Sequence, residues 1–320
     1  MKIFITGSSG YLGQHLLNAF ITRARTVSND NFEIYATYGS MEGFKDAVMA
    51  SIENRDSVSI KIDKVDLQDK EKIHSYVESN GPFDVCFHIG AMASPKACQL
   101  NEEKARAINI PQLFFDTLKD TPIIALSTDQ VYCGEKAPYS EDSDTGPVNV
   151  YAQSKLDMES LLLNDKSRTK PVVCLRSSII LGPLAPFGGA HSTFLHFCES
   201  REGKETTFFI DEARSVIAVK DVVQILLQFY DAIKSGKAFK SQVYNMGGSD
   251  RASRMDMAVA VAKACAFAHD VFIPAEKAKQ ERGINDVPSP LDISMNSSKL
   301  EEFVGWKFSG LEAIVKEAFA

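Results

Sequence analysis

The chain has 320 residues, enough to bury a large core in one big domain or in two unequal ones. Its 44% hydrophobic and 24% charged residues are typical of a globular protein. The formal net charge of -7, without a basic run, argues against non-specific nucleic-acid binding, and no apolar run is long enough to span a bilayer. We therefore expect neither a nucleic-acid nor a membrane partner.

Short apolar strands alternate with amphipathic helices through the first half of the chain. The predicted strands cover residues 2–6, 33–38, 59–67, 83–90, 122–128 and 171–178. The predicted helices begin near Tyr11, Asp69, Asn101 and Val150, with a short extra helix between residues 39 and 57. Apolar strands separated by helices indicate a parallel sheet covered on both faces. The predicted fold is therefore α/β, a doubly wound parallel-sheet Rossmann domain.

The alternation stops after Gly182, at a Pro/Gly-rich connection. We therefore predict the dinucleotide-binding domain over 1–182 and a smaller mixed α/β C-terminal substrate domain over 183–320. A long helix is expected between Asp221 and Gly236, and another begins after Ser253, a suitable N-cap residue. The chain is expected to return to the main sheet around 215–250.

The six cysteines are scattered without a C-x-x-C spacing, which predicts buried free thiols rather than disulfides or zinc ligands. His191 and His196 show no metal-ligand pattern either, so no metal site is predicted. Because the sequence opens with the predicted strand and glycine turn "MKIFITGSSG", we expect no signal peptide. A cytoplasmic location is the default expectation, with organellar and peroxisomal routes left open.

The strongest local motif is "ITGSSGYLG", in which Gly7, Gly10 and Gly13 directly follow the first strand. Glycines allow a tight turn and let backbone N–H groups approach a pyrophosphate, while the helix N-terminus attracts that anion. The turn therefore predicts a dinucleotide site. Its expected cofactor contacts in this segment are Gly7, Ser9, Gly10, Tyr11, Leu12 and Gly13.

The G-x-x-G-x-x-G spacing resembles the extended branch of the short-chain dehydrogenase/reductase superfamily. The resemblance implies that "VDLQD" places Asp66 and Leu67 against the adenine. It also implies that "HIGAMAS" lines the nicotinamide ribose. The expected contacts in that second motif are Gly90, Ala91 and Met92. His88, which opens the motif, is expected to be a packed strand histidine.

The end of the second predicted strand bears on the choice of cofactor. NAD-preferring enzymes carry a carboxylate there, which binds the ribose 2′-OH and repels a 2′-phosphate. This chain has Tyr38, Gly39 and Ser40 instead, which favours NADP(H) over NAD(H), with Tyr38 and Ser40 as cofactor contacts and Ser40 near the phosphate. The arginine usual for a 2′-phosphate is missing too.

Three tyrosine–lysine pairs have the i,i+4 spacing of a proton-transfer pair: Tyr132–Lys136, Tyr151–Lys155 and Tyr230–Lys234. Tyr151–Lys155 opens a helix after the fifth strand, and Thr128 ends that strand, where open α/β sheets bind ligands. A nearby ammonium favours the phenolate, and a threonine hydroxyl can hold a substrate oxygen. We therefore predict Thr128, Tyr151 and Lys155 as the catalytic residues, with Tyr151 and Lys155 also contacting the cofactor.

The block "LSTDQVYCGEKAPYSEDSDTGPVNVYAQSKLDMESLL" resembles dTDP-4-dehydrorhamnose reductases. The residues that match are Ser127, Thr128, Asp129, Val131, Gly134, Pro138, Tyr139, Glu141, Pro147, Tyr151, Ser154, Lys155 and Glu159. The resemblance implies reduction of the 4-keto group of a nucleotide-linked deoxysugar, with a nucleotide-sugar as partner and Tyr151 as proton donor. A sugar-nucleotide epimerase or dehydratase is a variant of this hypothesis, and a homodimer is possible.

The sequence departs from that family at Gln99 and Gln130, in a segment expected to face the sugar. In this respect it resembles the eukaryotic branch that includes the regulatory beta subunit of methionine adenosyltransferase. The alternative function is therefore a cofactor-binding regulatory subunit whose partner is a methionine adenosyltransferase catalytic subunit.

Four residues are candidates for binding the substrate: Asp129, Asn149, Ser178 and Arg214. Ser178 follows a strand, and Asn149 precedes the catalytic helix. The guanidinium of Arg214 suits a diphosphate. The alternative for Arg214 is a salt bridge to Asp211 or Glu212.

Overall fold

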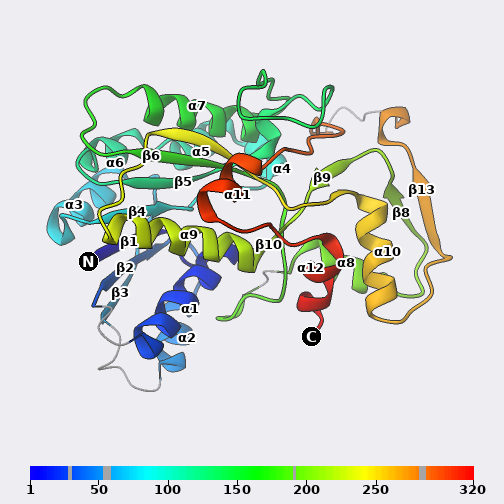
Figure 1. Ribbon diagram of the computed structural model, residues 1–320, viewed down its shortest axis with the longest axis horizontal. Coiled ribbons are helices and arrows are strands. Elements are labelled where there is room, and N and C mark those ends of the chain that lie inside the picture. The colour runs from blue at the N-terminus through cyan, green and yellow to red at the C-terminus, as the bar shows by residue number, and fades with distance from the viewer. Residues whose placement is uncertain (28–30, 53–58, 190–191, 281–285) are drawn as a thin grey trace.

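A parallel sheet forms the centre of the larger lobe in the computed structural model, which describes residues 1–27, 31–52, 59–189, 192–280 and 286–320 (Figure 1). In these ranges its seven strands, in spatial order, are β11 (Gln242–Met246), β6 (Val172–Ser177), β5 (Ile123–Thr128), β4 (Val85–His88), β1 (Lys2–Thr6), β2 (Glu33–Tyr38) and β3 (Ser59–Lys64). Every pairing between neighbours is parallel. The predicted doubly wound α/β fold is confirmed.

Helices cover both faces of the sheet (Figure 1). On one face lie α1 (Tyr11–Thr26), α2 (Phe44–Ser51), α9 (Val219–Lys234) and α11 (Ser298–Val304). On the other lie α3 (Lys70–Asn80), α4 (Pro95–Leu100), α5 (Glu102–Asn109), α6 (Gln112–Thr117) and α7 (Val150–Asn164). Side chains alternate along β1, so Ile3 and Ile5 join the first core while Phe4 joins the second. Both faces of the inner strands β1, β4, β5 and β6 are buried, which explains their apolar runs, whereas the edge strand β3 is largely exposed.

Among the residues that the structure describes, the smaller lobe holds short paired strands and three α-helices. The strand pairs are β7 (Ile180–Leu181) with β10 (Ile217–Ala218), β9 (Ala213–Ser215) with β12 (Arg251–Ser253), and β8 (Thr206–Phe209) with β13 (Phe272–Ala275). The helices are α8 (Phe194–Glu199), α10 (Arg254–Ala264) and α12 (Leu311–Ala318), around a separate apolar cluster. Ser253 caps α10 as predicted, in a reciprocal pair of hydrogen bonds with Asp256.

Several predicted elements differ from the structure at their ends. β3 stops at Lys64 and β4 covers only Val85–His88, because the residues that follow each strand turn into the wall of a cavity. The helix expected near Asn101 is three short helices, since Asn101 caps α5 and Pro111 separates α5 from α6. The extra helix is α2, while residues 53–57 of that stretch lie outside the described residues.

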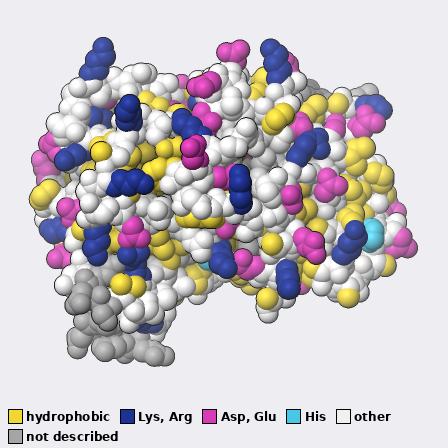
Figure 2. Space-filling model, in the orientation of Figure 1, with side chains coloured by type: hydrophobic (Ala, Val, Ile, Leu, Met, Phe, Trp, Pro, Cys, Tyr) yellow, Lys and Arg dark blue, Asp and Glu magenta, His cyan; other side chains and the backbone are white. Residues whose placement is uncertain are grey.

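The six cysteines are free thiols, and Cys86, Cys98, Cys174 and Cys198 are buried, as predicted. Over the described residues, no three His, Cys, Asp or Glu side chains are grouped in a way that could hold a metal, and His191 falls outside them. Within the same ranges, no helix has the length and apolarity needed to cross a membrane. Figure 2 shows acidic and basic side chains interspersed over one face of the molecule.

A buried ion pair ties α7 to the sheet. Arg176 on β6 donates to Glu159 on α7 at 2.8 Å, with side chains 7% and 3% exposed. Ser127 on β5 also donates to Glu159, and Arg176 donates to the hydroxyl of Tyr132 at 2.9 Å. These contacts hold α7 against β5 and β6, the strands that end beside its first turn.

We expect Glu159→Ala to lower the free energy of unfolding by about 3–5 kcal/mol, because Arg176 is left as an unpaired buried charge. The matched control is Asp157→Ala on the same helix, which removes an ion pair to Arg106, also 2.8 Å long but with side chains 43% and 31% exposed. That change is expected to cost at most about 1 kcal/mol. Urea denaturation measures both, and equal losses would contradict the assignment.

Candidate functional site

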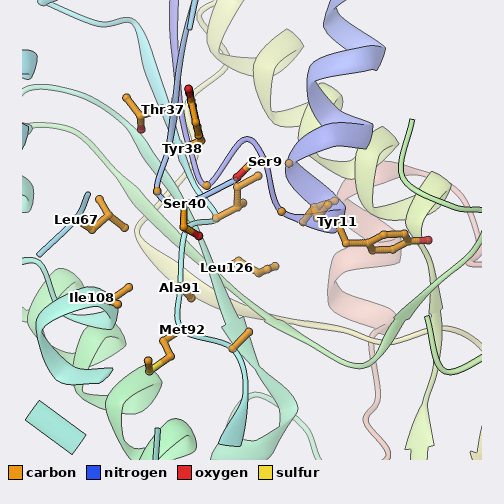
Figure 3. A pocket seen from close by; sticks show the side chains of 18 of the residues that line it. Ser9, Tyr11, Thr37, Tyr38, Ser40, Leu67, Ala91, Met92, Ile108 and Leu126 are labelled. Atoms are coloured by element: carbon orange, nitrogen blue, oxygen red, sulfur yellow. The ribbon is translucent and has the colours of Figure 1, made fainter. Parts of the chain in front are cut away.

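A cavity of about 540 Å³ opens at the carboxyl ends of the central strands (Figure 3). Its wall comes from the loops after β1, β2, β3 and β4 and from the first turn of α7. All the residues predicted to bind a cofactor lie in this wall: Gly7, Ser9, Gly10, Tyr11, Leu12, Gly13, Tyr38, Ser40, Asp66, Leu67, Gly90, Ala91, Met92, Tyr151 and Lys155. The structure thus brings together residues that are up to 148 positions apart (155 − 7).

The glycine turn brings three backbone segments into close contact. Gly7 has a φ of +69°, and a Cβ on it would lie 2.4 Å from the Cα of Gly90. A Cβ on Gly13 would lie 2.2 Å from the carbonyl oxygen of Gly7. Because no side chain fits here, the N-terminus of α1 sits directly at the cavity and presents unpaired N–H groups to it.

The wall after β2 is polar and uncharged. Tyr38 is half-buried with its ring edge-on to Phe44, and Ser40 is exposed near Ser9 (Figure 3). Tyr11 turns aside, donating from its hydroxyl to the carbonyl of Pro183 at 2.9 Å. The cations in the described wall are Lys104 and Lys155, which come from α5 and α7 rather than from β2.

Of the three tyrosine–lysine pairs, Tyr151–Lys155 is the one in the described cavity wall. Tyr132 is fully buried, stacked on Tyr139 with ring centroids 4.4 Å apart. Tyr230 is fully buried in the core, edge-on to Phe20. The i,i+4 spacing alone therefore does not mark a site; the position at the strand ends does.

Burial governs the protonation of this pair. It raises the pKa of Tyr151 to about 12, against a hydrogen bond from Thr128 that lowers it, while the charge of Asp129 raises it further. Burial lowers the pKa of Lys155 to about 8, although Cys174 and Glu159 act in the opposite direction. At neutral pH Tyr151 is therefore a protonated phenol, able to give up a proton, beside a lysine that is mostly charged.

Thr128 is 4% exposed and stands behind Tyr151 rather than in the cavity wall, where its neighbour Ser127 lies. Its hydroxyl donates to Oδ1 of Asp129 at 3.3 Å, and its proximity lowers the pKa of Tyr151. The predicted catalytic trio is thus contiguous. Its catalytic role stays a prediction.

His88 is a packed strand histidine, as expected. It is fully buried, and its Nδ1 lies 3.0 Å from Oγ1 of Thr6, which itself accepts from the N–H of Gly90 at 3.2 Å. Burial and the charge of Lys155 lower its pKa to about 3, so the ring is neutral. Its part is to hold the turn after β4 in place.

Asn109, the last residue of α5, is a site residue that is not among those predicted from the sequence. Its Oδ1 accepts from the N–H of Met92 at 2.8 Å, and its Nδ2 donates to Oγ of Ser154 at 2.9 Å. It therefore joins the cavity wall to the helix that carries Lys155. The sequence does contain one indication of this residue. Pro111 predicts that a helix ends just before it, and Asn109 is the polar residue at that helix end.

Asp129 and Ser178 lie next to each other, directly after β5 and β6, and are 3% and 5% exposed. Oδ2 of Asp129 and Oγ of Ser178 are both buried without a hydrogen-bond partner. Burial raises the pKa of Asp129, and the charge of Arg214 opposes that rise. The substrate-binding role predicted for both residues remains a prediction.

Arg214 makes the predicted alternative contact, a salt bridge to Glu212 at 3.3 Å. Burial alone would raise the pKa of Glu212, but Arg254, Arg214 and Lys277 hold it at about 2. The other alternative partner, Asp211, accepts instead from the N–H of Lys277 at 2.7 Å. Arg214 is 2% exposed, so the structure buries its guanidinium in protein contacts.

The geometry agrees with a match over the whole sequence: residues 1–320 fit the family described as the RmlD substrate binding domain. The chain belongs to this family. The family membership confirms the resemblance to dTDP-4-dehydrorhamnose reductases inferred from the "STD" and "YAQSK" segments.

Two relatives illustrate the range of proteins similar to this family member. Methionine adenosyltransferase 2 subunit beta of Xenopus laevis is 23% identical over 246 residues, which is 74% of this chain and 70% of the relative. UDP-N-acetyl-alpha-D-glucosaminuronate decarboxylase of Bacillus cytotoxicus is 24% identical over 310 residues, 90% of this chain and 88% of the relative. One relative is therefore a subunit and the other an enzyme.

Three solved structures share the fold. A hypothetical dTDP-4-dehydrorhamnose reductase from Sulfolobus tokodaii has a TM-score of 0.74 at 23% identity, covering 98% of each chain. The reductase from Bacillus anthracis in complex with NADP gives 0.73 at 15%, covering 99% of this chain and 98% of that one. UDP-glucuronic acid 4-epimerase from Bacillus cereus, with UDP-glucuronic acid and NAD, gives 0.76 at 20%, covering 100% and 98%. The chain therefore shares its fold with proteins named as reductases and as an epimerase.

The lowered pKa of Lys155 predicts how stability depends on pH. Between about 8 in the folded protein and the ordinary 10.5, the unfolded chain binds more protons, so the free energy of unfolding rises with pH across this window. The slope from this lysine is at most about 1.4 kcal/mol per pH unit. Lys155→Met should therefore stabilise the protein at pH 7 by more than at pH 10, in urea denaturation. A pH-independent difference would contradict this pKa.

Proposed function

We propose that the chain is an NAD(P)H-dependent oxidoreductase that reduces the 4-keto group of a nucleotide-linked deoxysugar. The observation that carries the proposal is the position of Tyr151 and Lys155 in the wall of the cavity, with Thr128 beside the tyrosine. The fold shared with structures named as nucleotide-sugar enzymes supports the substrate class.

The cavity suits a dinucleotide. Gly7 and Gly13 let the backbone come close to a pyrophosphate, and the N-terminus of α1 offers N–H groups to its charge. Leu67 and Ala91 supply apolar wall for the rings (Figure 3). When bound, a reduced nicotinamide supplies a hydride to the carbonyl carbon.

Tyr151 then supplies the proton. As the carbonyl oxygen gains negative charge, the O–H bond of Tyr151 breaks and its proton passes to that oxygen, giving the alcohol. The charged Lys155 stabilises the phenolate left behind, and Thr128, whose hydroxyl lies beside Tyr151, positions the phenol for the transfer. Asp129 and Ser178 are proposed to contact the sugar from the same side.

NADP(H) is the proposed cofactor in preference to NAD(H), because no carboxylate stands in the described wall after β2 to repel a 2′-phosphate. Fluorescence titration should therefore give a lower Kd for NADPH than for NADH. Ser40→Asp, which places a carboxylate at this position, should reverse that order. Tighter binding of NADH by the unaltered protein would refute the preference.

A regulatory subunit of methionine adenosyltransferase is the second candidate. The similarity to the Xenopus laevis subunit beta over 74% of this chain favours it. In that case the cavity binds a cofactor without turnover, and the partner is a methionine adenosyltransferase catalytic subunit.

A sugar-nucleotide epimerase is a third variant, supported by the fold shared with the Bacillus cereus epimerase. A cytoplasmic location and a homodimer stay predictions.

The decisive variant is Tyr151→Phe, which keeps the ring and removes the proton. It should lower NADPH consumption with 4-keto nucleotide sugars at least about 100-fold, the low end for a lost acid, while leaving NADPH binding unchanged. Tyr230→Phe is the matched control, since it alters another Tyr-x-x-x-Lys pair outside the described cavity wall. The Tyr230→Phe variant should consume NADPH at the same rate as the unaltered protein.

The same measurements separate the candidates. No turnover by the unaltered protein across a panel of keto-sugar nucleotides, together with co-purification of a methionine adenosyltransferase, would favour the regulatory subunit. Interconversion of a nucleotide sugar without net loss of NADPH would favour the epimerase.

A further inference from the structure

Residues 288–292 form a strap that runs from the smaller lobe to the start of the catalytic helix. The carbonyl of Pro288 accepts a hydrogen bond from Nδ2 of Asn149 at 3.0 Å. At the other end, Asp292 lies beside Ala213 of β9 in a parallel bridge, and Ile293 donates its N–H to the Ala213 carbonyl at 3.2 Å. The strap thus connects a strand of the smaller lobe to the residue before α7.

The two polar side-chain atoms of Asn149 form hydrogen bonds with different segments of the chain. Its Oδ1 accepts from the N–H of Ala152 at 2.9 Å and so caps α7. Its Nδ2 donates to Pro288 and also to Oε1 of Gln130 at 3.1 Å. Asn149 is 7% exposed, and Tyr151 follows two residues later. The side chain is therefore committed to protein contacts that fix the turn holding Tyr151.

Arg214, on β9 of the smaller lobe, holds the other end of the same strap. Its guanidinium donates to the carbonyls of Leu291 at 2.7 Å and Pro290 at 3.0 Å, and to Oγ of Ser289 at 3.4 Å. Glu212 balances its charge. Three consecutive strap residues are thus held by one planar group with fixed donor directions, a geometry that lysine does not reproduce.

We propose that Asn149 and Arg214 are positioning residues, the two anchors of a strap that sets the orientation of Tyr151, rather than direct contacts to the substrate. The amide group of Asn149 transmits the position of the strap to the first turn of α7. Movement of the strap in the smaller lobe, where the substrate domain is predicted, therefore changes where the phenol points. The expected effect on kcat rests on the proposed function. The tether of the strap to Asn149 and Arg214 rests only on the hydrogen bonds above.

The two polar atoms of the Asn149 side chain can be altered separately, because Oδ1 caps α7 and Nδ2 donates to Pro288 and Gln130. Asn149→Asp and Asn149→Ser keep an N-cap acceptor but lose both Nδ2 donations, whereas Asn149→Ala loses the cap as well. We expect Asp and Ser to lower kcat with keto-sugar nucleotide about tenfold or more, because small misplacements of a reacting group are costly. NADPH binding should stay near its unaltered value, and Tm should fall most for Ala, which loses the cap as well as the Nδ2 donations.

The matched control is Asn101, the exposed cap of α5, whose Oδ1 accepts from the N–H of Lys104 at 3.0 Å. Asn101→Asp and Asn101→Ser should leave kcat unchanged. If the two Asn149 variants also keep the unaltered kcat, Asn149 is a helix cap only and the proposal is overturned.

Hydrogen–deuterium exchange supplies a readout that needs no turnover. Asn149→Ser should speed exchange in a peptide covering 286–296, and Asn101→Ser should not. Should the unaltered protein show no turnover, the proposed reductase function fails while this measurement still decides whether Asn149 holds the strap. Unchanged exchange in that peptide would refute the tether.

A double-mutant cycle measures whether Asn149 and Arg214 act on the strap together. If Arg214→Lys and Asn149→Ser act through one strap, their combined effect on exchange in 286–296 should be smaller than the product of their separate effects. Strictly multiplicative effects would mean that the two residues act independently, which would overturn the two-anchor proposal.

Discussion

The close approach of β1, β4 and α1 at three glycines is the constraint on which the cavity depends. A Cβ at Gly7 or Gly13 would fall within 2.4 Å of neighbouring backbone, so the turn exists only because no side chain is there. The contact brings the N-terminus of α1 to the carboxyl ends of the central strands. It also fixes the loop after β4, whose Gly90 N–H bonds to Thr6. One steric condition thus positions both the anion-binding end and the opposite wall of the cavity.

Helix α7 is placed by buried polar contacts more than by an apolar face. Glu159 pairs with Arg176 beneath it, Ser154 accepts from Asn109 beside it, and Asn149 caps its start. Buried polar groups cost desolvation energy that apolar packing would not, but their directional bonds allow fewer orientations. The burial that lowers the pKa of Lys155 belongs to the same arrangement. The chain therefore gives up some stability for a defined position of Tyr151.

The order of strands and helices could be predicted from sequence because doubly buried parallel strands leave an unmistakable apolar run. The glycine turn and the Tyr151–Lys155 pair were predictable for a similar reason, since each is local in sequence and tied to a strand end. What escaped prediction joins distant residues: Asn109 with Ser154, Arg214 with residues 289–291, and Asn149 with Pro288. A single sequence carries no sign of such partners. The sequence indicated Asn149 only by its place before a helix, and Arg214 either as a substrate ligand or as the partner of Asp211 or Glu212, of which Glu212 is the one that it pairs with.

The chain reaches its seventh sheet strand late, after it has already built β7 to β10 of the smaller lobe. β11 pairs with β6, so β6 is an inner strand only when residues beyond 240 are present. A fragment cut at 182 would leave the fully buried strand "VVCLRS" as an open sheet edge. Unpaired apolar edges recruit other strands and promote aggregation. The two lobes are thus interwoven by the path of the chain, and neither is a severable module that could be exchanged between proteins by a single cut.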